Sequence, residues 1–205
     1  AMITRKAAPA LAAGCAFVAR PADLTPLSAL ALGVLADRAG IPAGVFSVVP
    51  SSDASAIGKE FCENPGIRKL TFTGSTEVGR YFLKYAAESN LKKVILELGG
   101  KSPAIVMDDV DDLQPIVEQL AIGILFSQGE NCSAGSRLLV HEKVKGRLLE
   151  ALVEHFKTWT VGDPLVEGTR IGALIDEKHM NNILGYICLL YTSDAADDSL
   201  RVDLG

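Results

Sequence analysis

Residues 68–98 read RKLTFTGSTEVGRYFLKYAAESNLKKVILEL, and the order of patterns within them decides the fold class. Apolar and β-branched residues at 68–72, and again at 92–98, are typical of strands. Between them, residues 76–88 carry apolar side chains at helical spacing, after a turn at Gly74. A strand, a helix and a second strand in this order predict a right-handed βαβ unit with parallel strands.

The same alternation continues on both sides of this unit. Further strands are expected at 15–20, 45–49, 103–107 and 137–141, and further helices at 26–38, 54–62, 113–126 and 144–159. The last of these helices is expected to turn inward the side chains of Leu148, Leu149, Leu152, Val153 and Phe156. These elements predict an α/β chain built on parallel strands. We place a domain boundary at Gly99-Gly100, because two adjacent glycines can bend the chain sharply.

The composition describes a folded chain without a strong charge bias. Of 205 residues, 48% are hydrophobic and 22% are charged, which excludes intrinsic disorder for most of the chain. The net charge of −5 gives no electrostatic reason to expect nucleic acid or an anionic membrane as partner. No apolar run approaches the ~20 residues of a membrane-spanning helix, and no secretory signal is visible. We expect a soluble, cytoplasmic protein.

Both ends of the chain depart from this regular pattern. Residues 1–11 already read as the middle of an amphipathic helix, so we expect the chain to be cut from something longer. Residues 188–205 show neither helical nor strand periodicity, and the string is similar to the translated read-through of a sequencing-library adapter. We interpret it as a non-native tail. The alternative is a disordered polar C-terminus.

Three segments contain residue types that could carry chemistry. Gly74 and Ser75 stand at the start of the 76–88 helix, where free N–H groups form a natural anion site or, equally, an ordinary N-cap. Glu97 ends an apolar strand, where burial would raise the pKa of its carboxyl group and suit a general base; the alternative is a structural carboxylate. Cys132 lies in a polar glycine-bearing loop, as a nucleophile requires, although one loop cysteine is more often incidental.

The remaining cysteines and the histidines add no second site. Cys15, Cys62 and Cys188 stand in apolar or helical settings, and the four cysteines of the chain have neither disulfide nor zinc spacing. No histidine lies within the polar motifs, so a Cys–His hydrolase is weakly supported and no metal site is expected.

Taken together, three motifs resemble the aldehyde dehydrogenase superfamily. They are FTGSTEVG at 72–79, LELGGK at 96–101 and QGENC at 128–132, in that order, with 132 − 97 = 35 residues from the glutamate to the cysteine. The resemblance covers about residues 1–186. It implies a partial NAD(P)-binding domain with a Rossmann-like parallel sheet at 1–98 and the first part of an α/β catalytic domain at 99–187, which leaves the expected non-native tail at 188–205.

The resemblance also implies a role for each matching residue. Cys132 matches the nucleophile, which forms a thiohemiacetal and then a thioester, and Glu97 matches the general base that activates water to hydrolyse the thioester. Ser75 would bind the cofactor pyrophosphate, and Gly74 would let the backbone approach it closely. Arg20 and Asp23 stand where the family has Lys-Pro-Ala-Glu at the adenosine ribose. An acid there favours NAD, while the shorter Asp23 and a phosphate-binding Arg20 leave NADP open.

The substrate and the competence of this chain are separate questions. Residues 2–79 look most like bacterial succinate-semialdehyde dehydrogenases, and residues 90–175 look more like γ-glutamyl-aminobutyraldehyde or general aldehyde types, so a mosaic is possible. The family implies a small aldehyde substrate and a homo-oligomeric parent enzyme. Its oxyanion-hole asparagine and its second ribose-binding glutamate lie outside this sequence. We therefore expect the chain alone to lack dehydrogenase turnover. A nucleotide-binding module, a thiol hydrolase and a broken reading frame remain alternatives.

Overall fold

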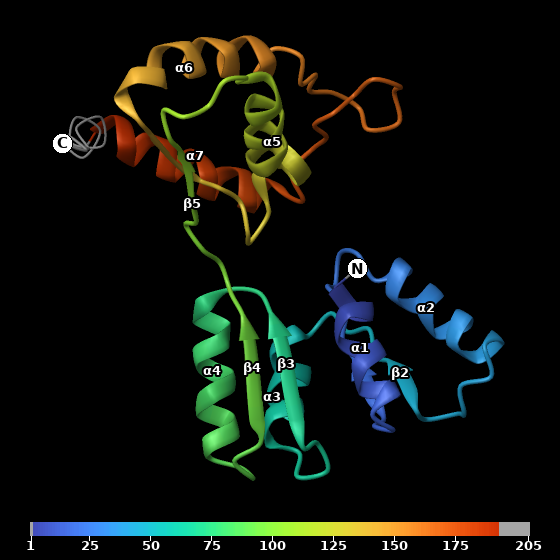
Figure 1. Cartoon of the computed structure of the whole chain (residues 1–205). Helices are drawn as coiled ribbons and strands as arrows, with labels where there is room; N and C mark the ends of the chain where they lie inside the picture. The colour runs from blue at the N-terminus through green and yellow to red at the C-terminus, as the bar shows by residue number, and fades with distance from the viewer. Residues whose placement is uncertain (1, 193–205) are drawn as a thin grey trace. The chain divides into compact units, whose positions relative to one another are not determined.

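The two strands of the 68–98 segment pair in parallel, as their sequence predicts. In the computed structural model, which describes residues 2–192, β3 (Lys69–Thr73) and β4 (Lys93–Glu97) run in register from Lys69 opposite Lys93 to Thr73 opposite Glu97. The crossover between them is α4 (Thr76–Ala87), which lies beside β4 (Figure 1). The βαβ unit is confirmed.

The other elements follow the predicted order. The chain divides between Leu98 and Gly99 into two units. The first unit also contains α1 (Met2–Ala12), β1 (Phe17–Ala19), α2 (Leu27–Arg38), β2 (Phe46–Val48) and α3 (Ala54–Glu63). The second contains β5 (Pro103–Val106), α5 (Gln114–Leu125), the 3-10 turn η1 (Phe126–Gly129), β6 (Arg137–Val140), α6 (Glu142–Phe156) and α7 (Glu177–Thr192). Strand β1 pairs with β2, and β5 with β6, both in parallel, which confirms the α/β class.

A buried lysine fixes the start of β4 against the end of α3. The Lys92 side chain is only 6% exposed, and its Nζ donates to the carbonyl oxygens of Phe61 at 3.0 Å and Asn64 at 2.7 Å. These are carbonyls at a helix C-terminus, where a cation is favourable. Burial lowers the pKa of Lys92, while the nearby Cys62 and Glu60 oppose that shift. The contact joins the C-terminal end of α3 to the start of β4, the strand that ends at Glu97.

The core of the second unit lies between α5, α6 and β5. It consists of the buried side chains of Val106, Val117, Val144, Leu148 and Leu152.

The predicted inward face of α6 is correct only in part. Leu148 and Leu152 are buried, but Leu149 is 44% exposed and Val153 is 55% exposed. Phe156 also remains at the surface. The helix carries two adjacent apolar stripes, and within residues 2–192 only one of them packs against α5 and β5. A helical period reveals an apolar face without showing how much of it a neighbour covers.

The C-terminal part also differs from the sequence expectation. Helix α7 runs through Cys188 to Thr192, so the absence of helical periodicity after residue 187 did not end the helix there. An unbroken helix can outlast its periodic pattern when no glycine or proline stops it. Residues 193–205, which hold the rest of the predicted tail, lie outside the described residues. Within residues 2–192, no helix is long and apolar enough to cross a membrane.

Candidate functional site

The turn between β3 and α4 places Ser75 at a helix N-terminus. Strand β3 ends at Thr73, and the Ser75 Oγ accepts a hydrogen bond from the Val78 backbone N–H at 3.3 Å. The Ser75 carbonyl accepts from Gly79 N–H at 3.0 Å, which begins the helical ladder. The N-cap interpretation of Ser75 is therefore confirmed. The same geometry leaves first-turn N–H groups and the positive end of the helix dipole facing outward, as an anion site requires.

Gly74 directly follows β3, is hydrogen-bonded to the end of β4, and has no room for a side chain. Its N–H donates to the Glu97 carbonyl oxygen at 3.1 Å, so the turn is tied to the end of β4. A Cβ at this position would lie 2.4 Å from Cζ of Phe72, whose ring packs edge-on against Phe82. Because the Phe72 ring is itself packed, only glycine fits here. Gly74 is also exposed, so a ligand could approach its backbone.

Glu97 lies at the same edge as this turn but is not buried. It pairs in register with Thr73 at the carboxyl end of β3, and its side chain is exposed. The burial on which its role as a base was argued from sequence is therefore absent from the described part of the chain. Glu97 is the last residue of β4, and the three strand residues before it are only partly buried. An exposed carboxylate at a strand end remains accessible to water and to substrate.

Sequence reasoning missed a lysine at this edge. Lys6, on α1, donates from Nζ to the Thr73 Oγ1 at 2.6 Å. Burial lowers the pKa of Lys6, the Glu97 charge opposes this shift, and Arg5 adds to it. The only signal in the sequence is a lysine that precedes the alanine-rich run of α1. The partly buried Lys6 ammonium group is therefore bonded to the Thr73 hydroxyl, next to Gly74 in the chain.

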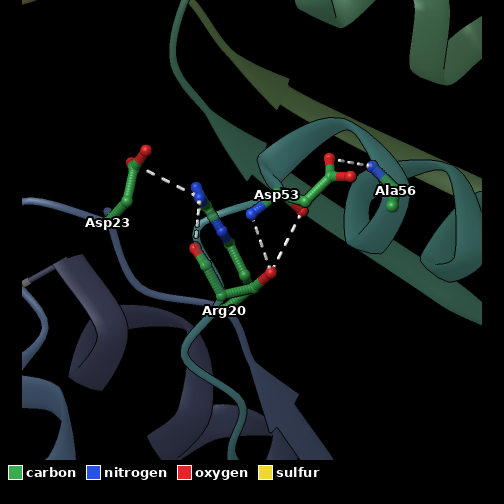
Figure 2. A network of polar contacts seen from close by, with 5 residues as sticks. Arg20, Asp23, Asp53 and Ala56 are labelled. Carbon is green, nitrogen blue, oxygen red and sulfur yellow. Dashed lines mark hydrogen bonds and ion pairs between the residues drawn. The ribbon is translucent and has the colours of Figure 1, made fainter.

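Arg20 and Asp23 form a polar network near the end of β1 (Figure 2). The Arg20 Nη2 lies 3.3 Å from the Asp23 Oδ1 and donates to the Ser51 carbonyl oxygen at 3.2 Å. Ser51 Oγ in turn accepts from the Asp53 N–H at 3.0 Å, and Asp53 caps α3 through Ala56 N–H at 2.8 Å. The Asp23 side chain is 52% exposed, so its carboxylate can also accept hydrogen bonds from a ligand.

Cys132 lies in the second unit, at the end of a loop with unusual backbone geometry. Ser127, Gln128 and Gly129 have φ values of 53°, 59° and 80°, so three consecutive residues adopt the left-handed conformation. The loop closes through Glu130 N–H, which donates to the Ser127 carbonyl oxygen at 2.9 Å. Asn131 Oδ1 accepts from the backbone N–H of Ser133 at 3.2 Å. The Cys132 side chain is exposed, as a nucleophile must be to reach a substrate.

Gly100, the second glycine of the Gly99-Gly100 pair, lies against this loop. A Cβ on Gly100 would lie 3.3 Å from the Cys132 carbonyl oxygen. Arg137, at the start of β6, donates from Nε to the Lys101 carbonyl oxygen at 2.8 Å, and Lys101 Nζ donates to the Gly100 carbonyl. The segment that follows the candidate base therefore supports the candidate nucleophile loop. Arg20, Asp23, Gly74, Ser75 and Glu97 belong to the first unit, and Cys132 to the second.

The other cysteines differ from Cys132 in their surroundings. Cys62 is fully buried, and burial raises the pKa of its thiol. Cys15 is exposed just after α1, and Cys188 is exposed on α7. Among residues 2–192, no group of three or more histidine, cysteine and acidic side chains could hold a metal ion. The loop position and the left-handed backbone before it single out Cys132.

Comparisons with known proteins identify the family of the chain. The model of the aldehyde dehydrogenase family matches residues 1–196. The chain belongs to the aldehyde dehydrogenase family. This family consists of oxidoreductase enzymes.

Individual aldehyde dehydrogenases show how far the similarity extends. The chain is 49% identical over 186 residues to aminoacetaldehyde dehydrogenase of Pseudomonas aeruginosa, across 91% of this chain and 37% of that protein. It is 48% identical over 205 residues to the succinate-semialdehyde dehydrogenase [NADP(+)] GabD of Escherichia coli, across 100% and 41%. A crystal structure of indole-3-acetaldehyde dehydrogenase with NAD+ superposes with a TM-score of 0.89 at 43% identity, across 93% and 38%. The chain thus spans about two fifths of these relatives.

Proposed function

We propose that this chain carries the dinucleotide-binding turn, the general base and the nucleophile of an NAD(P)-dependent aldehyde dehydrogenase. The observation that carries the proposal is the exposed Cys132 at the end of the left-handed loop, with Gly100, three residues after Glu97, close to the Cys132 carbonyl oxygen. A nucleotide-binding module without chemistry needs neither the thiol nor the carboxylate. Membership in an oxidoreductase family supports the same conclusion.

The residues of the first unit fit a dinucleotide. Gly74 presents a backbone without a side chain beside the N-terminus of α4, which suits a pyrophosphate group. The half-exposed Asp23 carboxylate can accept hydrogen bonds from ribose hydroxyls. When bound, NAD or NADP supplies the hydride acceptor for aldehyde oxidation. The chain's own residues supply the rest of the chemistry.

In the proposed reaction, Cys132 acts first and Glu97 second. The Cys132 thiolate attacks the aldehyde carbonyl carbon and forms a thiohemiacetal, while the Cys132 backbone N–H donates to the developing oxyanion. Loss of hydride leaves a thioester on the Cys132 sulfur. Glu97 accepts a proton from water, which attacks the thioester carbonyl, releases the carboxylate product and restores the thiol. Glu97 needs access to water for this step, and its exposed side chain provides it.

The charges at the proposed ribose site support NAD rather than NADP. The Asp23 carboxylate would repel a 2′-phosphate, and the Arg20 guanidinium already contacts Asp23 and the Ser51 carbonyl oxygen. A phosphate would have to compete with both partners for Arg20. The name of GabD contains NADP(+), and the similar structure of indole-3-acetaldehyde dehydrogenase contains NAD+. Both cofactors are therefore included in the test.

For the substrate we propose succinate semialdehyde, with a γ-glutamyl-aminobutyraldehyde or general aldehyde type as the alternative. The similarity to GabD supports the first. The similarity to aminoacetaldehyde dehydrogenase favours an amino-substituted aldehyde instead. We also propose that the full-length enzyme is a homo-oligomer in the cytoplasm.

A hybrid enzyme tests the proposed function. Residues 1–187 of this chain replace the matching segment of Escherichia coli GabD, so that nucleophile and base both come from this chain. We expect aldehyde-dependent NADH or NADPH production, with succinate semialdehyde preferred over aminoacetaldehyde. Cys132→Ala lowers kcat by at least about a thousandfold, whereas the control Cys15→Ala retains activity. A folded hybrid that binds dinucleotide and oxidises none of these aldehydes contradicts the proposal, as does activity that survives Cys132→Ala.

A further inference from the structure

The loop that precedes Cys132 contacts a segment 44 to 49 residues further along the chain. Glu130 Oε1 lies 3.0 Å from His179 Nε2, at the first turn of α7. With its amide oriented to satisfy both groups, the Gln128 side-chain oxygen accepts from Gly172 N–H at 3.1 Å and its nitrogen donates to the Ser127 carbonyl oxygen at 2.9 Å. Two side chains of the loop thus reach residues 172–179.

The far side of this contact is itself fixed. The His179 N–H donates to Asp176 Oδ1 at 2.7 Å, and Met180 N–H donates to the Asp176 carbonyl oxygen at 3.2 Å. Asp176 therefore caps the N-terminus of α7, and His179 stands in the capped first turn. A histidine held by a helix offers Glu130 a partner of defined position rather than a freely moving surface side chain.

The loop requires such support because its backbone is unfavourable by itself. Ser127 and Gln128 are non-glycine residues in the left-handed region, which L-residues rarely adopt consecutively. Such conformations persist when surrounding contacts determine them. Inside the loop, the Glu130 N–H bond to the Ser127 carbonyl closes the turn but leaves the position of the whole loop open. The contacts of Gln128 and Glu130 to residues 172–179, together with the approach of Gly100 to the Cys132 carbonyl oxygen, supply that position.

We propose that Glu130 and His179 are positioning residues, whose contact fixes the loop 127–132 and thereby the nucleophile at its end. Neither residue acts on the substrate. The Glu130 carboxylate is engaged by the imidazole of His179, and Cys132 follows two residues later. The functional meaning rests on the proposed function, since it requires Cys132 to be the nucleophile. The contact and its effect on the loop do not.

Peptide-resolved amide hydrogen exchange on the 205-residue chain tests the contact. Both Glu130→Gln and His179→Gln accelerate exchange in residues 127–134 by about two- to fivefold, the range expected for the loss of one half-exposed polar contact. The double variant is no faster than either single variant, because both changes remove the same contact. His179→Lys, which keeps an N–H donor for Glu130 at this position, restores slow exchange. Peptides from β5 and β6 stay unchanged in every variant, which separates loop release from general unfolding.

A matched control comes from another side-chain contact in the same unit. Lys157→Gln removes the contact between Lys157 and Glu154 near the end of α6 and leaves exchange in residues 127–134 unchanged. Unchanged loop exchange in both single variants overturns the proposal. So does a double variant whose effect is the product of the two single effects, or a His179→Lys variant as fast as His179→Gln.

The hybrid enzyme adds the catalytic readout. His179→Gln lowers kcat by about two- to fivefold while the KM for dinucleotide stays unchanged, because the contact acts on the nucleophile loop and not on the cofactor site. An inactive hybrid with the unaltered sequence would count against the proposed function and leave the exchange result standing. An active hybrid in which His179→Gln raises the dinucleotide KM with kcat unchanged would overturn the positioning role.

Discussion

Ser75 has a structural role that can be separated from its proposed role in binding. Its Oγ caps α4, just as the Asp53 carboxylate caps α3. Ser75→Ala and Asp53→Ala should each lower the free energy of unfolding by about 1 kcal/mol. Only Ser75→Ala should weaken NAD binding, by about tenfold, since only the α4 turn contains the proposed phosphate site. Denaturant unfolding and isothermal titration with NAD measure the two effects. Equal NAD affinity in both variants would show that Ser75 is a cap and nothing more.

Asp108 gives the second unit a defined dependence on acid. The hydrogen bond from Lys143, at 2.8 Å, is the main reason that the pKa of Asp108 lies below its ordinary value; His141 acts in the same direction. A lowered carboxyl pKa in the folded state stabilises the fold above the ordinary aspartate pKa. That contribution is lost as the pH falls through the folded value.

The prediction is therefore a pH-dependent difference between wild type and Asp108→Asn. The two Tm values should differ most near neutral pH and converge below about pH 4. Lys143 is held at a raised pKa by the same contact and stays charged across this range. The control Asp109→Asn keeps the Asp108–Lys143 pair and should not converge in this way. A constant Tm difference between wild type and Asp108→Asn at all pH values would argue against the ion pair.

At the scale of the element, α6 offers two neighbouring leucines with opposite surroundings. Leu148 is fully buried in the core of the second unit, while Leu149 is 44% exposed. Leu148→Ala should lower the free energy of unfolding by about 3 kcal/mol, and Leu149→Ala by less than about 1 kcal/mol. Fluorescence of Trp159, the single tryptophan, reports denaturant unfolding close to this helix. Similar losses in both variants would mean that a further partner covers the Leu149 stripe.

The same elements show what sequence could and could not predict. The βαβ unit was predictable because strand and helix periods alternate between residues 68 and 98, and the N-cap at Ser75 follows from its place before the helix. The exposure of Glu97 and of Leu149 was not predictable from sequence. An apolar pattern indicates which residues tend to be buried, but actual burial depends on which element packs against them. Contacts such as Lys6 with Thr73, or Glu130 with His179, join segments far apart in sequence, and no local pattern marks them.

At the scale of the whole molecule, the chain spans about two fifths of the length of its relatives. Binding of the dinucleotide should therefore be measurable without catalytic turnover. We expect the purified 205-residue chain to bind NAD and to produce no NADH from succinate semialdehyde, because it matches only about two fifths of the length of these relatives. Titration calorimetry and absorbance at the NADH band measure the two. Sustained NADH production that is lost in Cys132→Ala would show that the chain is sufficient by itself.

The most direct measurement is the mass of the enzyme during turnover. The hybrid enzyme with Glu97→Gln, mixed with NAD and succinate semialdehyde, should accumulate an adduct of one acyl group, because hydrolysis of the thioester lacks its base. Peptide mapping should locate this adduct on Cys132, while the unaltered hybrid, which hydrolyses it, shows little. An adduct on another cysteine, or none in a hybrid that still produces NADH in a burst, would contradict the assignment of Cys132 as nucleophile and Glu97 as base.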